Sequence, residues 1–99
     1  MIYYTVLIYI HESEERTYLE YEDLTLPILE DYNGELVYRL KTNSAQSDSS
    51  EDFPYEVHLL RFENQSDFDA YLKDERRVKA THLKEQSIKK TVLVKGNKV

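Results

Sequence analysis

The sequence contains no cysteine, no tryptophan, and only two glycines and two prolines in 99 residues. The lack of cysteine excludes disulfide bonds, a thiolate nucleophile and a zinc–thiolate site, and it fits a reducing compartment. Long apolar runs are also lacking. The opening MIYYTVLIYI is too short to span a bilayer, has no basic residues before it and continues into the acidic HESEE. We therefore expect a core strand there, no membrane partner and a cytoplasmic protein.

Basic residues are scarce in the first three quarters of the chain. Residues 1–72 contain 4 Lys or Arg and 16 Asp or Glu, whereas residues 73–99 contain 9 and 3, so the net charge of −6 divides into −12 and +6. A basic end is one feature of nucleic-acid-binding proteins. Here it lacks interleaved exposed aromatic residues and a glycine-rich phosphate loop. We predict a solvated surface and no nucleic-acid partner.

The composition is that of an ordinary globular chain, with 40% hydrophobic and 32% charged residues. A chain of this length forms one domain, so we predict a single domain over residues 1–99. Its first strand, residues 2–10, has apolar side chains on both parities. Both faces of that strand should therefore be covered.

A helical pattern follows over residues 13–33. Ser13 is a candidate N-cap, and Asn33-Gly34 supplies a left-handed C-terminal stop. Pro27 removes a backbone donor, which predicts a kink or break near residues 23–27. The apolar stripe of this helix consists of Tyr18, Tyr21, Leu24, Ile28 and Tyr32.

The second half of the chain predicts three further strands and a second helical region. The strands are residues 35–42, 55–63 and 88–96, and residues 43–52 form a polar connector that we expect to be weakly ordered. Ser66 and Asp69 resemble a capping box at the start of a helix whose buried stripe is Phe68, Tyr71 and Leu72, and a less apolar helical stretch covers residues 75–84.

The resulting order is β-α-β-β-α-β, the order of an α+β, ferredoxin-like fold with an antiparallel sheet and both helices on one face. Two helices on one face leave the other face of the sheet uncovered. Since the strands have apolar residues on both parities, an identical sheet is the economical cover. We predict a homodimer through the helix-free face.

Several segments resemble the dimeric α/β-barrel superfamily, closest to its small bacterial proteins of unknown function. They are YLEY (18–21), Pro27-Ile28, DYNGELVYR (31–39), HLLRFENQSDFDAYLKDERR (58–77) and VLVKG (92–96). The resemblance implies the ferredoxin-like fold, the dimer and a small cavity between sheet and helices that takes aromatic or polyketide-like compounds. The cofactor-free monooxygenases and haem-degrading members rely on a tryptophan, which this chain lacks.

Polar residues inside the third strand are the candidates for a site. Phe62 should pack beneath the second helix, so period-two alternation places His58 and Glu56 on the same helix-facing side. They could form an acid–base pair or a structural hydrogen bond. Tyr55, Val57, Leu59 and Arg61 should face the partner sheet, with Arg61 in an ion pair at the dimer rim.

The candidate ligand-binding residues are therefore His58, Glu56, Arg39 and Tyr18. Arg39 could anchor an anion or be solvated at an edge strand, and Tyr38, on the opposite parity, should belong to the core. His11, Glu12, His58 and His82 lack any tight metal-ligand spacing, so we predict neither a metal site nor a cofactor.

Two functions remain open at this point. The first is a protein that binds a small molecule in the cavity between sheet and helices, with or without cofactor-independent catalysis. The second is a non-catalytic structural or interaction module that acts through its dimer surface. A cavity with converging polar groups would favour the first function, and a core filled by tyrosines would favour the second.

Overall fold

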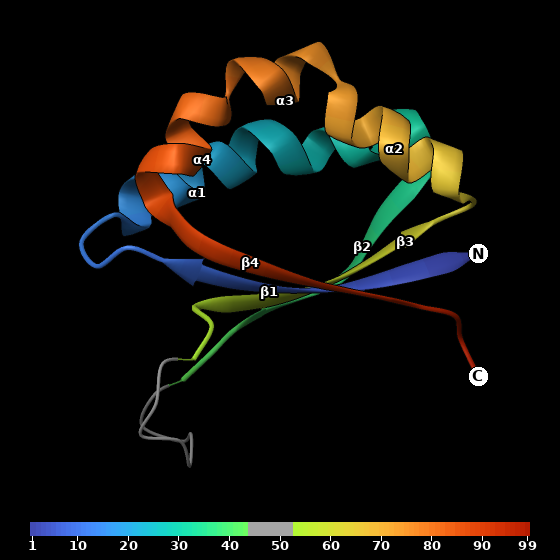
Figure 1. Cartoon of the computed structure of the whole chain (residues 1–99), viewed down its shortest axis with the longest axis horizontal. Coiled ribbons are helices and arrows are strands. Elements are labelled where there is room, and N and C mark those ends of the chain that lie inside the picture. Colours follow the sequence, from blue (N-terminus) through green and yellow to red (C-terminus); the bar gives the residue numbers. More distant parts are fainter. Residues whose placement is uncertain (44–52) are drawn as a thin grey trace.

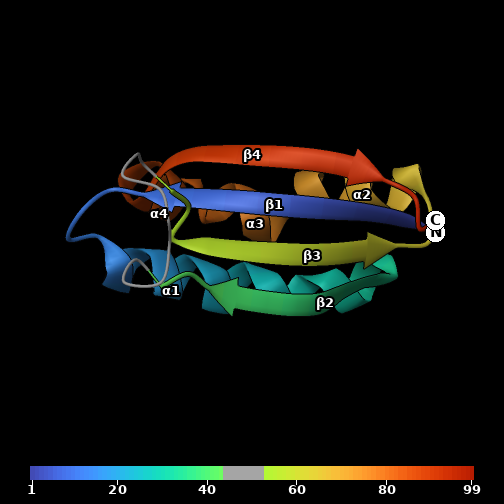
Figure 2. The ribbon, with the colours of Figure 1, turned by 90° about the horizontal axis from the view of Figure 1, so that it is seen from below.

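Four antiparallel strands form one sheet in the computed structural model, which describes residues 1–43 and 53–99. The strands are β1 (Ile2–Ile10), β2 (Gly34–Lys41), β3 (Glu56–Phe62) and β4 (Ile88–Gly96). Their order across the sheet is β2-β3-β1-β4, which Figure 2 shows from below. Most of the predicted connector, from residue 44 to residue 52, lies outside the described residues.

The helices form a single layer over one face of this sheet (Figure 1). They are α1 (Glu15–Thr25), the 3-10 helix η1 (Leu26–Tyr32), α2 (Gln65–Lys73), α3 (Glu75–Lys79) and α4 (Thr81–Ser87). This arrangement confirms the predicted α+β, ferredoxin-like fold. None of the helices in the described part of the chain has the length and apolarity that a bilayer crossing requires.

Aromatic side chains fill the space between one end of the sheet and α2. The ring of Tyr4 stacks on Phe68 with centroids 4.0 Å apart, and the ring of Phe62 lies 5.3 Å from Phe68 and 5.6 Å from Tyr71. Such offset and edge-to-face pairs add to the stabilisation that burial alone provides. The predicted packing of Phe62 beneath Phe68 and Tyr71 is confirmed.

The first helical region breaks where proline predicts. The α-helix ends at Thr25 and continues as the tighter η1, with Pro27 in its first turn, because proline cannot donate the hydrogen bond of a helix interior. Asn33 ends η1 in the left-handed conformation with φ 55°. The predicted Ser13 cap is wrong: Ser13 lies in a left-handed turn with φ 72°, and Glu14 precedes the helix without a side-chain cap.

The second helical region begins two residues earlier than its predicted capping box. Asn64 is the N-cap, and its Oδ1 accepts a hydrogen bond of 3.0 Å from the backbone N–H of Asp67. The Ser66 hydroxyl donates to the same Asn64 oxygen, so the prediction of Ser66 as the cap is wrong. The stretch predicted over residues 75–84 consists of the two short helices α3 and α4.

Two leucines predicted in the buried stripes lie at the surface. Leu24 is 53% exposed and Leu72 is 45% exposed. The buried face of α1 instead contains Tyr18, Tyr21, Glu22 and Thr25. Positions three, four and seven residues after Tyr18 share one helix face, and Leu24, six residues after Tyr18, falls outside that set.

A β-bulge in β2 changes which of its side chains face the helices. Leu36 pairs with Leu60, and Tyr38 pairs with the adjacent Leu59. Val37 therefore has no counterpart in β3 and is an extra residue in the ladder. Side chains alternate between the faces, and one inserted residue therefore exchanges the faces of everything that follows. Tyr38 consequently lies on the helix-free face and is 47% exposed, and its predicted place in the core is wrong.

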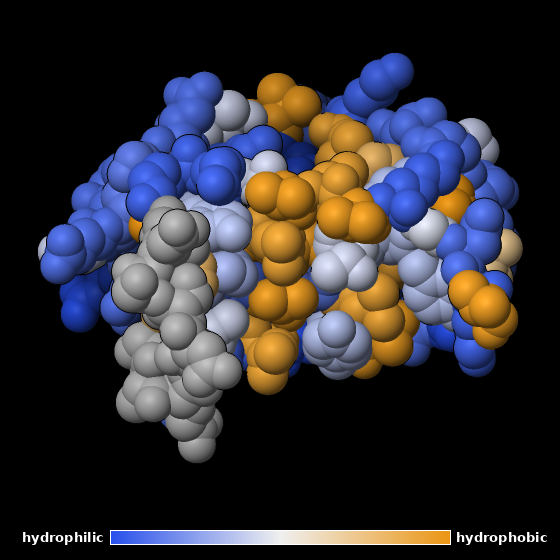
Figure 3. Space-filling view, turned by 60° about the horizontal axis from the view of Figure 1, so that its bottom comes forward, coloured by the Kyte–Doolittle hydropathy of each residue, from blue (hydrophilic) through white to orange (hydrophobic). Residues whose placement is uncertain are grey.

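The helix-free face of the sheet is rich in apolar side chains, which Figure 3 shows gathered across its middle. The strand pairing places on this face Leu7, Val57, Leu59, Leu40, Val92 and Val94, together with Tyr3, Tyr9 and Tyr38. Arg61 is on the same face and forms an ion pair with Glu35 of β2. Tyr55, predicted here, instead lies edge-on against Tyr18 with ring centroids 5.6 Å apart.

Candidate functional site

The carboxylate of Glu56 is the centre of a buried polar cluster under α1. Its Oε1 accepts hydrogen bonds from the Tyr18 hydroxyl at 2.6 Å and from Arg39 Nε at 2.8 Å, and it lies 2.9 Å from His58 Nε2. Glu56 is 4% exposed and His58 is 3% exposed. Three donors thus converge on one carboxylate oxygen in the interior.

These donors keep Glu56 ionised. Burial alone would raise the pKa of the Glu56 carboxyl, but the hydrogen bonds from His58, Arg39 and Tyr18 lower that pKa to about 2. Conversely, burial together with Glu22 and Glu56 raises the pKa of the Tyr18 phenol. Near neutral pH the cluster therefore contains a carboxylate and a neutral phenol.

The ionised Glu56 fixes the orientation of the His58 ring. A carboxylate only accepts hydrogen bonds, so His58 Nε2 donates to it. In the neutral ring the lone pair then resides on Nδ1, which becomes the basic atom. This is the arrangement in which a carboxylate orients a histidine for proton transfer.

Each of the four predicted site residues belongs to this cluster. Tyr18 comes from α1, and Glu56 and His58 come from β3, where alternation places them on the helix-facing side. Arg39 comes from β2, directly opposite His58 in the ladder. Arg39 reaches this side because of the bulge at Val37, and it binds Glu56 rather than solvent alone.

His58 also lines a cavity of about 230 Å³ between the sheet and the helices. Most of the cavity surface is apolar, contributed by the rings of Tyr21 and Tyr71 and by Val6, Ile8, Leu26, Leu60, Phe68, Leu72, Ile88 and Leu93. Its polar and charged side chains are Glu22, Thr25, His58, Arg77, Lys84 and Thr91. A mainly apolar cavity with a few converging polar groups is typical of small-molecule sites, although this one is smaller than the roughly 300–1,000 Å³ of drug-sized sites.

Glu22 is a residue of this cavity that the sequence did not single out. It is 5% exposed. Burial raises the pKa of its carboxyl to about 7, against the opposing influence of His58 and Arg39. A buried carboxyl that changes charge near neutral pH can both accept and donate a proton. Its signal in the sequence was its position four residues after Tyr18, on the same helix face.

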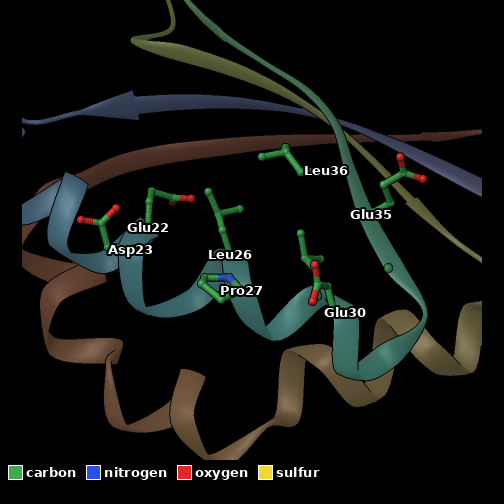
Figure 4. A pocket seen from close by; sticks show the side chains of 9 residues that line it. Glu22, Asp23, Leu26, Pro27, Glu30, Glu35 and Leu36 are labelled. Carbon is green, nitrogen blue, oxygen red and sulfur yellow. The ribbon is translucent and has the colours of Figure 1, made fainter.

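A second cavity, of about 410 Å³, lies between α1, η1 and β2. Figure 4 shows Glu22 and Leu26 extending from the helix toward the strands, and both residues also line the first cavity. The other acidic residues of this second cavity are Asp23, Glu30 and Glu35. Within residues 1–43 and 53–99 no three His, Cys, Asp or Glu side chains are arranged so that they could hold a metal ion, and this holds for the four carboxyl groups of the second cavity.

The sequence matches no protein-family model, and no curated protein is similar to it in sequence. Solved structures do match. A protein of unknown function from Rhodopseudomonas palustris has a TM-score of 0.83 at 12% identity, over 99% of this chain and 82% of its own. A dabb family protein with a ferredoxin-like fold from Mesorhizobium loti has a TM-score of 0.68 at 15% identity, over 99% and 96%.

A third similar structure is a dimeric protein of unknown function with a ferredoxin-like fold from Bacteroides fragilis, with a TM-score of 0.69 at 12% identity, over 96% of this chain and 93% of its own. At identities this low, the TM-scores show that the fold is shared. The chain thus has the ferredoxin-like fold of small bacterial proteins, among them a dabb family member, as its sequence pattern predicted.

Proposed function

We propose that the protein binds a small, mainly apolar molecule in the cavity between its sheet and its helices, beside His58. The observation that carries this proposal is the contrast within the cavity wall: an apolar lining interrupted by His58, whose ring a buried carboxylate orients. A core with no ligand to accommodate is filled to near crystal density. A cavity of about 230 Å³ beside oriented polar groups is better explained by a ligand.

The same groups would support acid–base chemistry without a cofactor. His58 Nδ1 is the candidate base, Glu56 is the group that orients it, and Tyr18 and Arg39 hold Glu56 in place. Binding is the core of the proposal, and proton transfer to or from the bound molecule is the reaction that fits these residues.

A thermal-shift screen of single-ring aromatic and short aliphatic compounds tests the binding. A compound present at 100 times its dissociation constant should stabilise the fold by about 2.7 kcal/mol. The variant His58→Ala should lose most of that gain. The control is Ile28→Val, which removes a methyl group from the buried core outside the cavity. It should lower the free energy of unfolding by about 0.5–1.5 kcal/mol and leave the ligand-induced stabilisation unchanged.

Two results would contradict the binding proposal. One is a screen in which no compound stabilises the protein. The other is a His58→Ala variant that keeps the full ligand-induced gain while it loses several kcal/mol without ligand, because that combination belongs to a structural histidine.

A second function is favoured by the helix-free face of the sheet. Its apolar side chains include Leu40 at 53% and Val94 at 54% exposure, on a face that no described helix covers. Contiguous apolar surface of this kind marks interaction sites. We propose that a second copy of the chain covers it, sheet against sheet, with Leu59 and Val57 at the centre. The similar Bacteroides fragilis protein is itself described as dimeric.

A further inference from the structure

Two ionisable side chains of opposite charge type line the cavity, Glu22 on α1 and Arg77 on α3. Glu22 is 5% exposed. The Nε of Arg77 is buried and has no hydrogen-bond partner within residues 1–43 and 53–99. Most buried polar groups in proteins are paired. The guanidinium of Arg77 is therefore incompletely paired within the described part of the chain.

The guanidinium of Arg77 is held in place although its Nε is unpaired. Its Cζ lies 4.4 Å from the centroid of the Tyr71 ring, and its Nη2 donates to the Tyr21 hydroxyl at 3.2 Å. Stacking and a hydrogen bond together fix the plane of the group. The guanidinium is therefore an oriented cation at the cavity wall, to which a bound molecule could present an acceptor.

The geometry points to Arg77 as an anion anchor, so that the ligand of this cavity is a small apolar molecule bearing one carboxylate. This inference rests on the proposed function. Arginine remains charged at all physiological pH values, and charge-assisted hydrogen bonds are about twice as strong as neutral ones. Lys84 lines the same cavity and adds positive charge. The volume of about 230 Å³ favours a ligand with a single ring.

Glu22 does not exclude an anion. Burial raises the pKa of its carboxyl to about 7, so at pH 6 the Glu22 side chain is a neutral carboxylic acid in most protein molecules. A neutral carboxylic acid offers a hydrogen-bond donor to a ligand oxygen. The titratable groups that influence Glu22 most are His58 and Glu56 on β3, Arg39 on β2 and Arg77 on α3, and Lys84 of α4 lines the same cavity. Binding of the carboxylate should therefore weaken as the pH rises through about 7.

Phenylacetate and its neutral counterpart phenylacetamide test the anchor at pH 6. We expect phenylacetate to bind the wild-type protein about 10- to 100-fold more tightly, measured by calorimetry. Chemical-shift changes of cavity-lining residues would locate the binding. In Arg77→Gln the two probes should bind almost equally well. Arg77→Lys keeps the charge but lacks the planar guanidinium, so it should retain part of the preference for phenylacetate.

Arg76→Gln is the matched control. Arg76 is exposed, forms ion pairs with Asp31 and Asp74 and does not line the cavity, so its removal changes the net charge equally and should leave the preference intact. Equal affinity of the two probes for the wild-type cavity would overturn the anchor while the binding proposal stands. Failure of both probes and of every compound in the wider screen would overturn both proposals.

Discussion

The raised pKa of Glu22 makes the stability of the fold depend on pH in a direction that can be measured. The carboxyl has a pKa of about 7 in the folded chain and an ordinary value of 4.5. A group whose pKa is raised by folding contributes its full stability below the unfolded value, and this stability is lost as the pH rises through the folded value. A rise of this size corresponds to about 3 kcal/mol of stability, which is lost as the pH rises from about 4.5 to about 8.

Glu22→Gln should remove this loss, because glutamine fills nearly the same volume and does not ionise. Urea unfolding at equal protein concentration gives the free energy of unfolding at pH 5 and at pH 8. Between these pH values the wild type should lose about 2–3 kcal/mol relative to Glu22→Gln. Glu20→Gln, the same change at an exposed position of α1, should behave like the wild type.

The pH window keeps a second carboxyl from interfering. Folding lowers the pKa of Glu56 to about 2, so its contribution is present above about pH 4.5 and is lost only as the pH falls toward 2. If the wild type and Glu22→Gln differ by the same free energy at pH 5 and pH 8, Glu22 is not buried as an ionisable group in solution, and the reasoning fails.

Two further predictions concern the apolar face and the second helical region. Val57→Asp would place an unpaired carboxylate in the proposed sheet-to-sheet interface, so sedimentation at micromolar concentration should show a monomer in place of a dimer. The control Leu24→Asp, at an exposed helix position, should remain a dimer. A monomeric wild type would refute the dimer. Because Asn64 caps α2, Asn64→Ala should lower the free energy of unfolding in urea by about 1 kcal/mol, and Ser66→Ala should lower it clearly less. A larger loss in Ser66→Ala would contradict the assignment of Asn64 as the cap.

The helix-facing side of β3 could be predicted because its alternation is unbroken. Glu56, His58, Leu60 and Phe62 are all buried, in the order that period two requires. The same rule failed one strand away. It placed Tyr38 in the core, because the run LVYRL contains no sequence signal for a bulge at Val37. The bulge depends on how β2 pairs with the partner strand β3.

The cavity residues Glu22 and Arg77 were missed for a different reason. Acidic residues on a helix and basic residues near a chain end are usually solvated, so each has a more common explanation than burial. The signal for Glu22 was its spacing from Tyr18 and Thr25. Leu24, one turn after Tyr21, is apolar and was therefore assigned to the buried helix face in its place. Which of the two faces is buried depends on where η1 turns the chain, a tertiary property.

Both outer strands of the sheet carry an irregularity. β2 has the extra residue Val37, and the pairing of β1 with β4 shifts register between Tyr9 and Ile10. An exposed edge is a template for further strands, and bulges and lysines at an edge discourage such pairing. The sheet is thus a poor seed for fibrous growth in its own plane, and a concentrated solution of this protein should resist strand-by-strand aggregation despite its apolar face.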